Sequence, residues 1–305
     1  MSAAPLTAAQ VVAGVDLAGA TVVVTGATTG MGLATARALA TAGAETVLLG
    51  RDQDRLDEAV RAVAAAARQR THGVLAELAD LNSVARAVDE IAATVGDVRI
   101  LVNNAGVMFT PFGVTADGHE LQFGTNHLGH FALTVGLEPL LGKGGARVVN
   151  LSSAGHKIAA PELDDLGWAR RTYDKFAAYG ASKTANIWFS SELDRRWADR
   201  GVRSFAVHPG TVATDLARHM DRDDFKTMAQ LSAAQPGAAK RMSFATPEEG
   251  AATAVWAAVT PDLADRGGLY LADCAISEDV APWAFDADRA AELWELSERW
   301  VSAPA

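Results

Sequence analysis

The 305-residue sequence is poor in cysteine, in positive charge and in long apolar runs. Its one cysteine, Cys274, excludes an internal disulfide and a cysteine metal cluster, which fits the reducing cytoplasm. The 27 Lys and Arg are outnumbered by 37 Asp and Glu, so the formal net charge is −10 and nucleic-acid binding is not expected. No apolar run approaches the ~18–20 residues of a membrane span, and residues 1–19 lack the basic start of a secretory signal. We therefore expect a cytoplasmic protein without a membrane span.

Apolar runs typical of buried strands alternate with helical patterns from residue 20 onward. The expected strands cover 20–25, 45–49, 73–78, 99–102, 146–151, 202–207 and 268–271; the expected helices cover 7–15, 33–43, 54–70, 82–95, 118–141 and 247–259. This alternation predicts right-handed crossovers and one doubly wound, Rossmann-type parallel sheet flanked by helices, in the α/β class. We expect one domain over residues 1–305, with an N-terminal extension at 1–18 and a C-terminal tail at 278–305.

A glycine-rich loop, residues 26–32, separates the first expected strand from the first long helix. Glycines at this place let the backbone turn tightly and approach a pyrophosphate, which then rests on the helix N–H groups. An ordinary strand-to-helix turn is the alternative. The spacing is Gly-x-x-x-Gly-x-Gly rather than the more familiar Gly-x-Gly-x-x-Gly.

Two charged residues follow expected strands at the edge where ligands bind in such sheets. Arg51 comes after the second strand, where a guanidinium suits a 2′-phosphate and so favours NADP(H) over NAD(H). Asp52 beside it leaves NAD(H) open, and an exposed surface arginine is the alternative. Asp80 after the third strand could accept a hydrogen bond from an adenine amino group or could cap the next helix.

Tyr179 and Lys183 stand at positions i and i+4 ahead of a helical pattern. On a helix this spacing places both side chains on one face. A nearby cation favours the ionised phenol, so we expect Lys183 to lower the pKa of Tyr179. The pair predicts proton transfer to or from a carbonyl or alcohol oxygen.

Further short motifs stand in a fixed order between residues 19 and 214. They are Thr25-Gly26-Ala27-Thr28-Thr29-Gly30-Met31-Gly32, Asp80-Leu81, Asn103-Asn104-Ala105-Gly106, Thr125-Asn126-His127-Leu128-Gly129-His130-Phe131, Ser152-Ser153, Tyr179 with Lys183, and His208-Pro209-Gly210. In this set and order the sequence resembles a short-chain dehydrogenase/reductase. Within that family it is similar to the branch typified by retinol dehydrogenase-like and WW-domain oxidoreductase-like proteins.

The resemblance implies a catalytic set of Asn126, Ser153, Tyr179 and Lys183. Tyr179 would exchange a proton with the substrate oxygen, and Ser153 would hydrogen-bond that oxygen. Lys183 would lower the Tyr179 pKa and hold the nicotinamide ribose. Asn126 would hold a water of a proton relay behind Lys183. Ser152 suits the catalytic role less well, because the serine of the family is usually the second of such a pair.

The resemblance also implies a nicotinamide cofactor, with NADP(H) favoured and NAD(H) possible. The implied contacts are Gly26, Thr28, Thr29, Gly30, Met31, Gly32, Arg51, Asp80, Leu81, Asn104, Ala105, Gly106, Tyr179, Lys183, Pro209, Gly210, Val212 and Thr214. The expected reaction is hydride transfer between the cofactor and a ketone, aldehyde or secondary alcohol. Residues 209–246, between the last two expected strands, are the expected substrate lid, and their Met and Phe side chains indicate a hydrophobic substrate or local core.

Other functional classes have weaker support. A non-catalytic nucleotide-binding regulatory protein and a reductase of a C=C bond remain alternatives. A hydrolase is not expected because the Gly-x-Ser-x-Gly motif is absent. No metal is expected either, since His127 and His130 could face one ion but no third ligand lies near them in the sequence. A homo-oligomer is compatible with the sequence.

Overall fold

A computed structural model describes residues 5–142, 145–212, 215–233 and 244–302. Its eight strands form one sheet in the order β3-β2-β1-β4-β5-β6-β7-β8. The strands are β1 Thr21–Thr25, β2 Glu45–Gly50, β3 Thr71–Leu75, β4 Ile100–Asn103, β5 Ala146–Leu151, β6 Val202–His208, β7 Leu269–Ala272 and β8 Ala275–Ile276. β1 to β7 pair in parallel, and β8 adds an antiparallel edge to β7. The prediction of a doubly wound parallel sheet is confirmed, although the two-residue β8 was not predicted.

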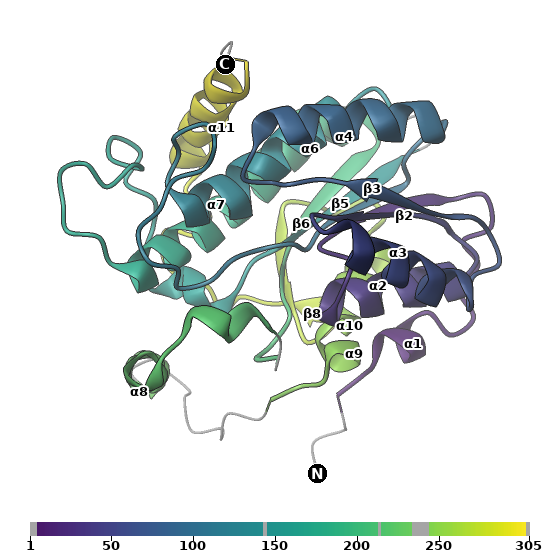
Figure 1. The fold of residues 1–305 in the computed structure, drawn as a ribbon, viewed down its shortest axis with the longest axis horizontal. Helices are drawn as coiled ribbons and strands as arrows, with labels where there is room; N and C mark the ends of the chain where they lie inside the picture. Colours follow the sequence, from purple (N-terminus) through teal and green to yellow (C-terminus); the bar gives the residue numbers. More distant parts are fainter. Residues whose placement is uncertain (1–4, 143–144, 213–214, 234–243, 303–305) are drawn as a thin grey trace.

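Helices cover both faces of the sheet (Figure 1). One face packs against α1 Ala8–Val11, α2 Gly30–Thr41, α3 Gln53–Ala64, α9 Pro247–Gly250 and α10 Ala252–Val259. The other face packs against α4 Leu81–Thr94, α6 Gly129–Gly136, α7 Lys175–Trp197 and α11 Ala287–Val301. Burying the central strands on both sides explains their continuous apolar sequence. Among the described residues, no helix is both long enough and apolar enough to cross a bilayer.

Strand pairing shifts two predicted boundaries. The predicted helix 54–70 ends as α3 at Ala64, and the predicted strand 73–78 is β3 at Thr71–Leu75. β3 must align with β2, where Thr46 pairs with Thr71, and this register requires the helix to end earlier. The strand thus stops well before Asp80, which instead begins α4.

The predicted helix 118–141 is shorter and is interrupted. It consists of α5 Leu121–Phe123, a π-helical turn η1 Gly124–Leu128, and α6. Asn126 lies inside the π turn. An asparagine is unfavourable in a regular helix, and π turns are frequent at functional sites, so this irregularity directs attention to Asn126.

Candidate active site

The glycine loop joins β1 to α2 at the carboxyl edge of the sheet. Gly26 and Gly30 have left-handed φ values of +62° and +56°, which favour glycine. A Cβ on Gly32 would lie 2.2 Å from the Gly26 carbonyl oxygen, so the loop can close on α2 only without a side chain there. Thr29 begins α2 with no side-chain cap bond, and the first turn contains no acidic residue. The N–H groups at this end of α2 are therefore available to an anion.

A chain of buried hydrogen bonds connects the loop to the π turn. The Thr25 hydroxyl accepts the N–H groups of Asn104 and Ala105 at 2.9 and 3.0 Å, and lies 2.8 Å from His130 Nε2. His130 Nδ1 lies 2.9 Å from the Asn126 carbonyl oxygen, which can only accept, so Nδ1 carries the proton and the Thr25 hydroxyl donates to Nε2. The Asn104 amide donates to the Thr25 carbonyl oxygen at 2.8 Å. These contacts hold the turn after β4 against the glycine loop.

His127 and His130, which were not expected to bind a metal, are buried in this region. Burial lowers the pKa of His127 to about 3 and that of His130 to about 4. His127 Nε2 contacts the Ser297 hydroxyl on α11 at 2.9 Å, and His130 orients Thr25. Both therefore have structural roles. Among the described residues, no group of three or more His, Cys, Asp or Glu side chains could hold a metal ion.

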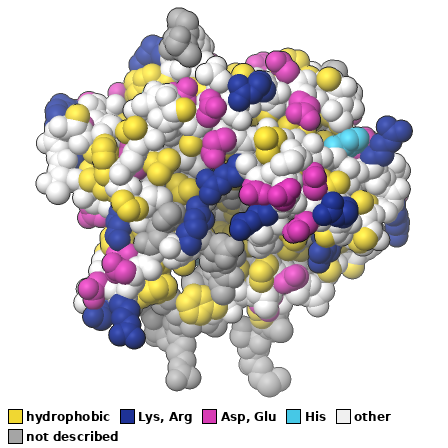
Figure 2. Space-filling view, in the orientation of Figure 1, with side chains coloured by type: hydrophobic (Ala, Val, Ile, Leu, Met, Phe, Trp, Pro, Cys, Tyr) yellow, Lys and Arg dark blue, Asp and Glu magenta, His cyan; other side chains and the backbone are white. Residues whose placement is uncertain are grey.

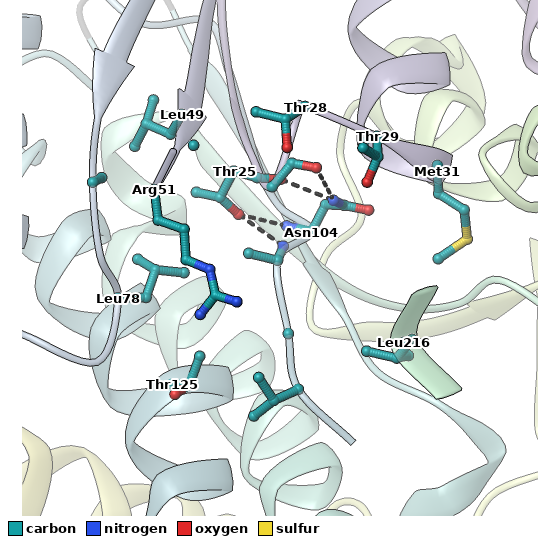
Figure 3. A pocket seen from close by; sticks show the side chains of 18 of the residues that line it. Thr25, Thr28, Thr29, Met31, Leu49, Arg51, Leu78, Asn104, Thr125 and Leu216 are labelled. Carbon is teal, nitrogen blue, oxygen red and sulfur yellow. Dashed lines mark hydrogen bonds between the residues drawn. The ribbon is translucent and has the colours of Figure 1, made fainter. Parts of the chain in front are cut away.

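A cavity of ≈ 500 Å³, here called the loop cavity, extends from the glycine loop across the ends of β1, β2 and β4 (Figure 3). It brings together ten residues that the sequence nominated for cofactor binding: Gly26, Thr28, Thr29, Gly30, Met31, Gly32, Arg51, Asn104, Ala105 and Gly106. Thr125 also lines it, although the Thr125 hydroxyl itself is buried and has no hydrogen-bond partner within the described structure. A pocket with uncapped helix N–H groups fits a phosphate-bearing nucleotide.

Asp80 and Leu81, which were also nominated for cofactor binding, do not line the loop cavity. Asp80 caps α4 by accepting the N–H groups of Asn82 and Ser83 at 2.9 and 3.2 Å, which is the alternative considered for it. The Leu81 N–H donates to Asp117. Their contact with a cofactor remains a prediction. Thr214 lies outside the described residues.

The loop cavity also contains charged residues that the sequence did not indicate. Arg55 on α3, Glu77 after β3 and Arg218 line it together with Arg51. Figure 2 shows basic and acidic side chains side by side near the middle of the drawn face. Arg55 is four residues after Arg51, but the end of β2 and the start of α3 lie between them. Their spacing in the sequence therefore did not predict that their side chains would lie close together. Only the folded chain places these side chains at one opening.

A second cavity, of ≈ 220 Å³ and here called the tyrosine cavity, adjoins the first and shares Met31, Asn104, Gly106 and Leu216 with it. Ser153, Tyr179, Lys183, Pro209, Gly210 and Val212, all nominated from the sequence, line it. Tyr179 and Lys183 lie on α7, as predicted from their spacing. The two catalytic candidates therefore reach the space beside the glycine loop.

Close packing places the serine beside the tyrosine. A Cβ on Gly180 would lie 2.8 Å from the Gly155 carbonyl oxygen, so the segment after β5 can rest directly on α7. Ser153 Oγ accepts the Gly155 N–H at 3.0 Å, and Gly155 packs directly against the Tyr179 ring, because a Cβ on it would lie 2.8 Å from Tyr179 Cε1. Ser152 instead donates to the Lys183 carbonyl oxygen at 2.9 Å and is buried. The geometry thus selects the second serine of the pair.

The electrostatics of the pair differ from the expectation. Burial raises the pKa of Tyr179 to about 12, and the nearby Ser153 hydroxyl offsets only part of that rise. This net rise is opposite to the expected lowering, because desolvation dominates. The Lys183 Nζ lies 5.6 Å from the ring centre, and its lowering effect on the Tyr179 pKa remains a prediction. Burial also lowers the pKa of Lys183 to about 8, and its Nζ donates to the Leu151 carbonyl oxygen at 3.0 Å.

Asn126 is buried behind Lys183 and lines neither cavity. Its side-chain oxygen accepts the Val107 N–H at 2.8 Å, and its amide donates to the Val107 carbonyl oxygen and the Ser182 hydroxyl, both at 2.9 Å. These bonds tie the turn after β4 to α7. A water-holding role for Asn126 remains a prediction.

The walls of the tyrosine cavity are mostly apolar. They include Met108, Phe109, Ile158, Phe176, Met220, Phe225, Met228, Leu231 and Phe244. The last five come from the predicted lid, of which residues 213–214 and 234–243 lie outside the described residues. Helix α8, Arg222–Ala233, belongs to this segment, and its Asp224 forms an ion pair with Lys175 at the start of α7 at 2.6 Å. A salt bridge therefore joins the predicted lid to α7.

Comparison with known proteins gives three consistent similarities. The family model for short chain dehydrogenases matches residues 20–224. Retinol dehydrogenase 13 of Homo sapiens is 38% identical over 292 residues, covering 94% of this chain and 86% of that protein. A crystal structure from Mycobacterium Paratuberculosis superimposes with a TM-score of 0.77 at 34% identity, covering 99% of this chain and 100% of the other.

A further crystal structure contains a nucleotide. It is a protein from Beutenbergia cavernae, described as an NAD(P) dependent gluconate 5-dehydrogenase, with bound NADP at low occupancy. Its TM-score is 0.65 at 31% identity, and the match covers 85% of this chain and 96% of that one.

Proposed function

The chain belongs to the short-chain dehydrogenase/reductase family, in its retinol dehydrogenase-like branch, and from that premise we propose that it is an NADP(H)-preferring oxidoreductase. Its substrate would be a ketone, aldehyde or secondary alcohol with a hydrophobic body. One observation carries the proposal: Tyr179, Lys183 and Ser153 open together into an apolar cavity that adjoins the loop cavity. Arg51 in the loop cavity supports the preference for a 2′-phosphate.

Each catalytic side chain has a proton or a charge to contribute. A nicotinamide cofactor, when bound, supplies or accepts the hydride. With a pKa of about 12, Tyr179 is protonated at neutral pH and can donate to a carbonyl oxygen in the reducing direction. Ser153 accepts the Gly155 N–H, which leaves its own proton for the same oxygen. Lys183, with a pKa of about 8, is largely cationic at pH 7 and stabilises negative charge developing on the phenol.

The apolar walls favour a substrate that is hydrophobic around its reacting oxygen. Phe109 packs edge-on against Tyr179, with ring centres 5.1 Å apart, and Phe176 packs against Phe109 at 4.4 Å. A polar substrate would lose hydration against these rings without gaining hydrogen bonds. A screen of cofactor consumption with aliphatic, aromatic and polycyclic carbonyls would identify the class. If the cofactor were consumed only with hydrophilic sugars, the proposal of a hydrophobic substrate would be contradicted.

Tyr179→Phe tests the proton donor. Removing the hydroxyl should lower kcat by about 10²- to 10⁴-fold, the usual contribution of a positioned acid, while NADPH fluorescence titration shows nearly unchanged binding. Tyr173→Phe is a matched control, because its hydroxyl bonds Glu120 and Gln122 outside both cavities. Retained turnover in Tyr179→Phe would remove the proposed acid. Wild-type protein that binds NADPH yet reduces no carbonyl would favour a non-catalytic role.

A further inference from the structure

The backbone of Ser153 is held by a buried histidine three residues later. His156 lies in the 3₁₀ turn η2 Ala154–Lys157, which follows Ser153 directly, and its side chain is buried. Its Nδ1 lies 2.6 Å from the Ser153 carbonyl oxygen, and its backbone N–H donates to the same oxygen at 3.1 Å. The Ser153 hydroxyl accepts the Gly155 N–H in the same turn. The carbonyl group of Ser153 is therefore fixed by two hydrogen bonds from His156.

The other ring nitrogen of His156 bonds the C-terminal tail. The Ala281 N–H donates to Nε2 at 3.1 Å, so Nε2 carries no proton. The Ser153 carbonyl oxygen can only accept, so Nδ1 carries the proton. Both contacts require the same neutral tautomer, and burial lowers the pKa of His156, which favours the neutral ring at pH 7. One imidazole thus joins the segment after β5 to the tail with both of its nitrogens bonded.

The tail segment that bonds His156 is itself anchored to α7. The indole N–H of Trp283 donates to the His156 carbonyl oxygen at 3.2 Å. The indole N–H of Trp188 on α7 donates to the Trp283 carbonyl oxygen at 2.8 Å. In addition, Lys157 forms an ion pair with Asp279 at 2.5 Å. Because α7 also carries Tyr179, these bonds relate the position of the Ser153 backbone to that of the proposed proton donor.

We propose that His156 is a positioning residue that directs the Ser153 hydroxyl toward the substrate oxygen by fixing the Ser153 carbonyl group. This rests on the proposed function, in which Ser153 bonds that oxygen. His156 lines neither cavity, so its effect on the reaction passes through the serine. A rotation of the Ser153 peptide group would move the hydroxyl, and a displacement of about 1 Å at a reacting group can cost about 100-fold in rate.

Two substitutions separate the two contacts of the ring. His156→Asn retains an N–H donor near the position of Nδ1 but loses the acceptor for Ala281. His156→Gln reaches the position of Nε2 and can accept the Ala281 N–H, but it has no donor for the Ser153 carbonyl oxygen. With the carbonyl that the wild type reduces fastest, kcat should stay within about threefold in His156→Asn and fall about 10- to 100-fold in His156→Gln. Fluorescence titration should give an unchanged Kd for NADPH in both.

A double-mutant cycle with Ser153→Ala tests whether His156 acts through the serine. Ser153→Ala alone should lower kcat by about 10²- to 10³-fold. In the Ser153→Ala background, His156→Gln should lower kcat by less than about twofold further, because no hydroxyl remains to be positioned. His127→Gln is the control, since His127 is equally buried and bonds Ser297 on α11. Its effect on kcat should be the same with and without the Ser153 hydroxyl.

The proposal is overturned if the losses in His156→Gln and Ser153→Ala multiply. It is also overturned if His156→Asn loses more than about tenfold in kcat, and this result decides the matter even where His156→Gln fails to fold. Urea unfolding of each variant shows that kcat is measured on folded protein. Wild-type protein that binds NADPH yet reduces no carbonyl would instead refute the proposed function, and the proposal with it.

Discussion

Lys183→Met should abolish turnover and yet make the protein more stable at pH 7. Burial lowers the pKa of Lys183 from 10.5 to about 8, so the folded state holds its charge at a penalty of about 3 kcal/mol. Methionine has a similar length and no charge. The variant loses the hydrogen bond to the Leu151 carbonyl oxygen, about 1 kcal/mol, but that oxygen still accepts from Asn186 at 2.9 Å. The expected net gain is about 2 kcal/mol.

The pH dependence identifies the origin of this gain. Because the folded pKa of Lys183 is lowered, the unfolded chain binds more protons between pH 8 and 10.5, and the stability of the wild type rises with pH across that window. Above pH 10.5 the amine is neutral in both states and the penalty disappears. The gain of the variant should therefore be present at pH 7 and be lost near pH 10.5.

Urea unfolding followed by tryptophan fluorescence at both pH values measures the difference, since groups common to both proteins cancel. Lys226→Met provides the control, because the Lys226 side chain is 72% exposed and its replacement should give no such gain. A Lys183→Met protein less stable than the wild type at pH 7, or a gain that persists at pH 10.5, would refute the reasoning.

Two further predictions concern the glycine loop and the buried histidines. Gly32→Ala places a Cβ 2.2 Å from the Gly26 carbonyl oxygen, so the glycine loop must shift. Calorimetric titration should therefore show NADPH binding that is at least about tenfold weaker. An unchanged affinity would mean that the loop accommodates the Cβ without losing its binding conformation. Burial lowers the pKa of His127 to about 3, so as the pH falls the unfolded state takes up a proton on this histidine before the folded state does. The free energy of unfolding therefore decreases below pH 6.5. Between pH 7 and pH 5 the wild type should lose about 2 kcal/mol more of it than His127→Gln. Equal losses in urea unfolding would contradict this.

The helices and strands could be predicted well because their signals are local. Continuous apolar runs gave β1, β2, β4, β5 and β6 to within one residue or two, since central strands need apolar side chains on both faces. The boundaries of α3 and β3 were wrong because the pairing of β3 with β2 sets them, and neither segment contains that information. The π turn around Asn126 was not predicted, because the expected helix 118–141 was taken as continuous.

The placement of the proposed catalytic pair on one helix was predictable for a similar reason. Tyr179 and Lys183 lie four residues apart on one helix, so their spacing alone places them on one face. Their pKa values were not predictable in the same way. Sequence spacing suggests attraction between the two charges, whereas burial within the folded protein raises the pKa of Tyr179 and lowers that of Lys183.

The sequence by itself determined the sheet class, the glycine loop and the spacing of the proposed catalytic pair, because each depends on residues that are neighbours along a strand, a turn or a helix. Only the tertiary structure decided that Glu77 lies 3.5 Å from Arg51, that Asp80 caps α4, and that the Ser152 hydroxyl bonds the Lys183 carbonyl oxygen. The physical reason is the same in each case. Desolvation and the approach of charges distant in sequence depend on packing, and packing is fixed only when the whole chain has folded.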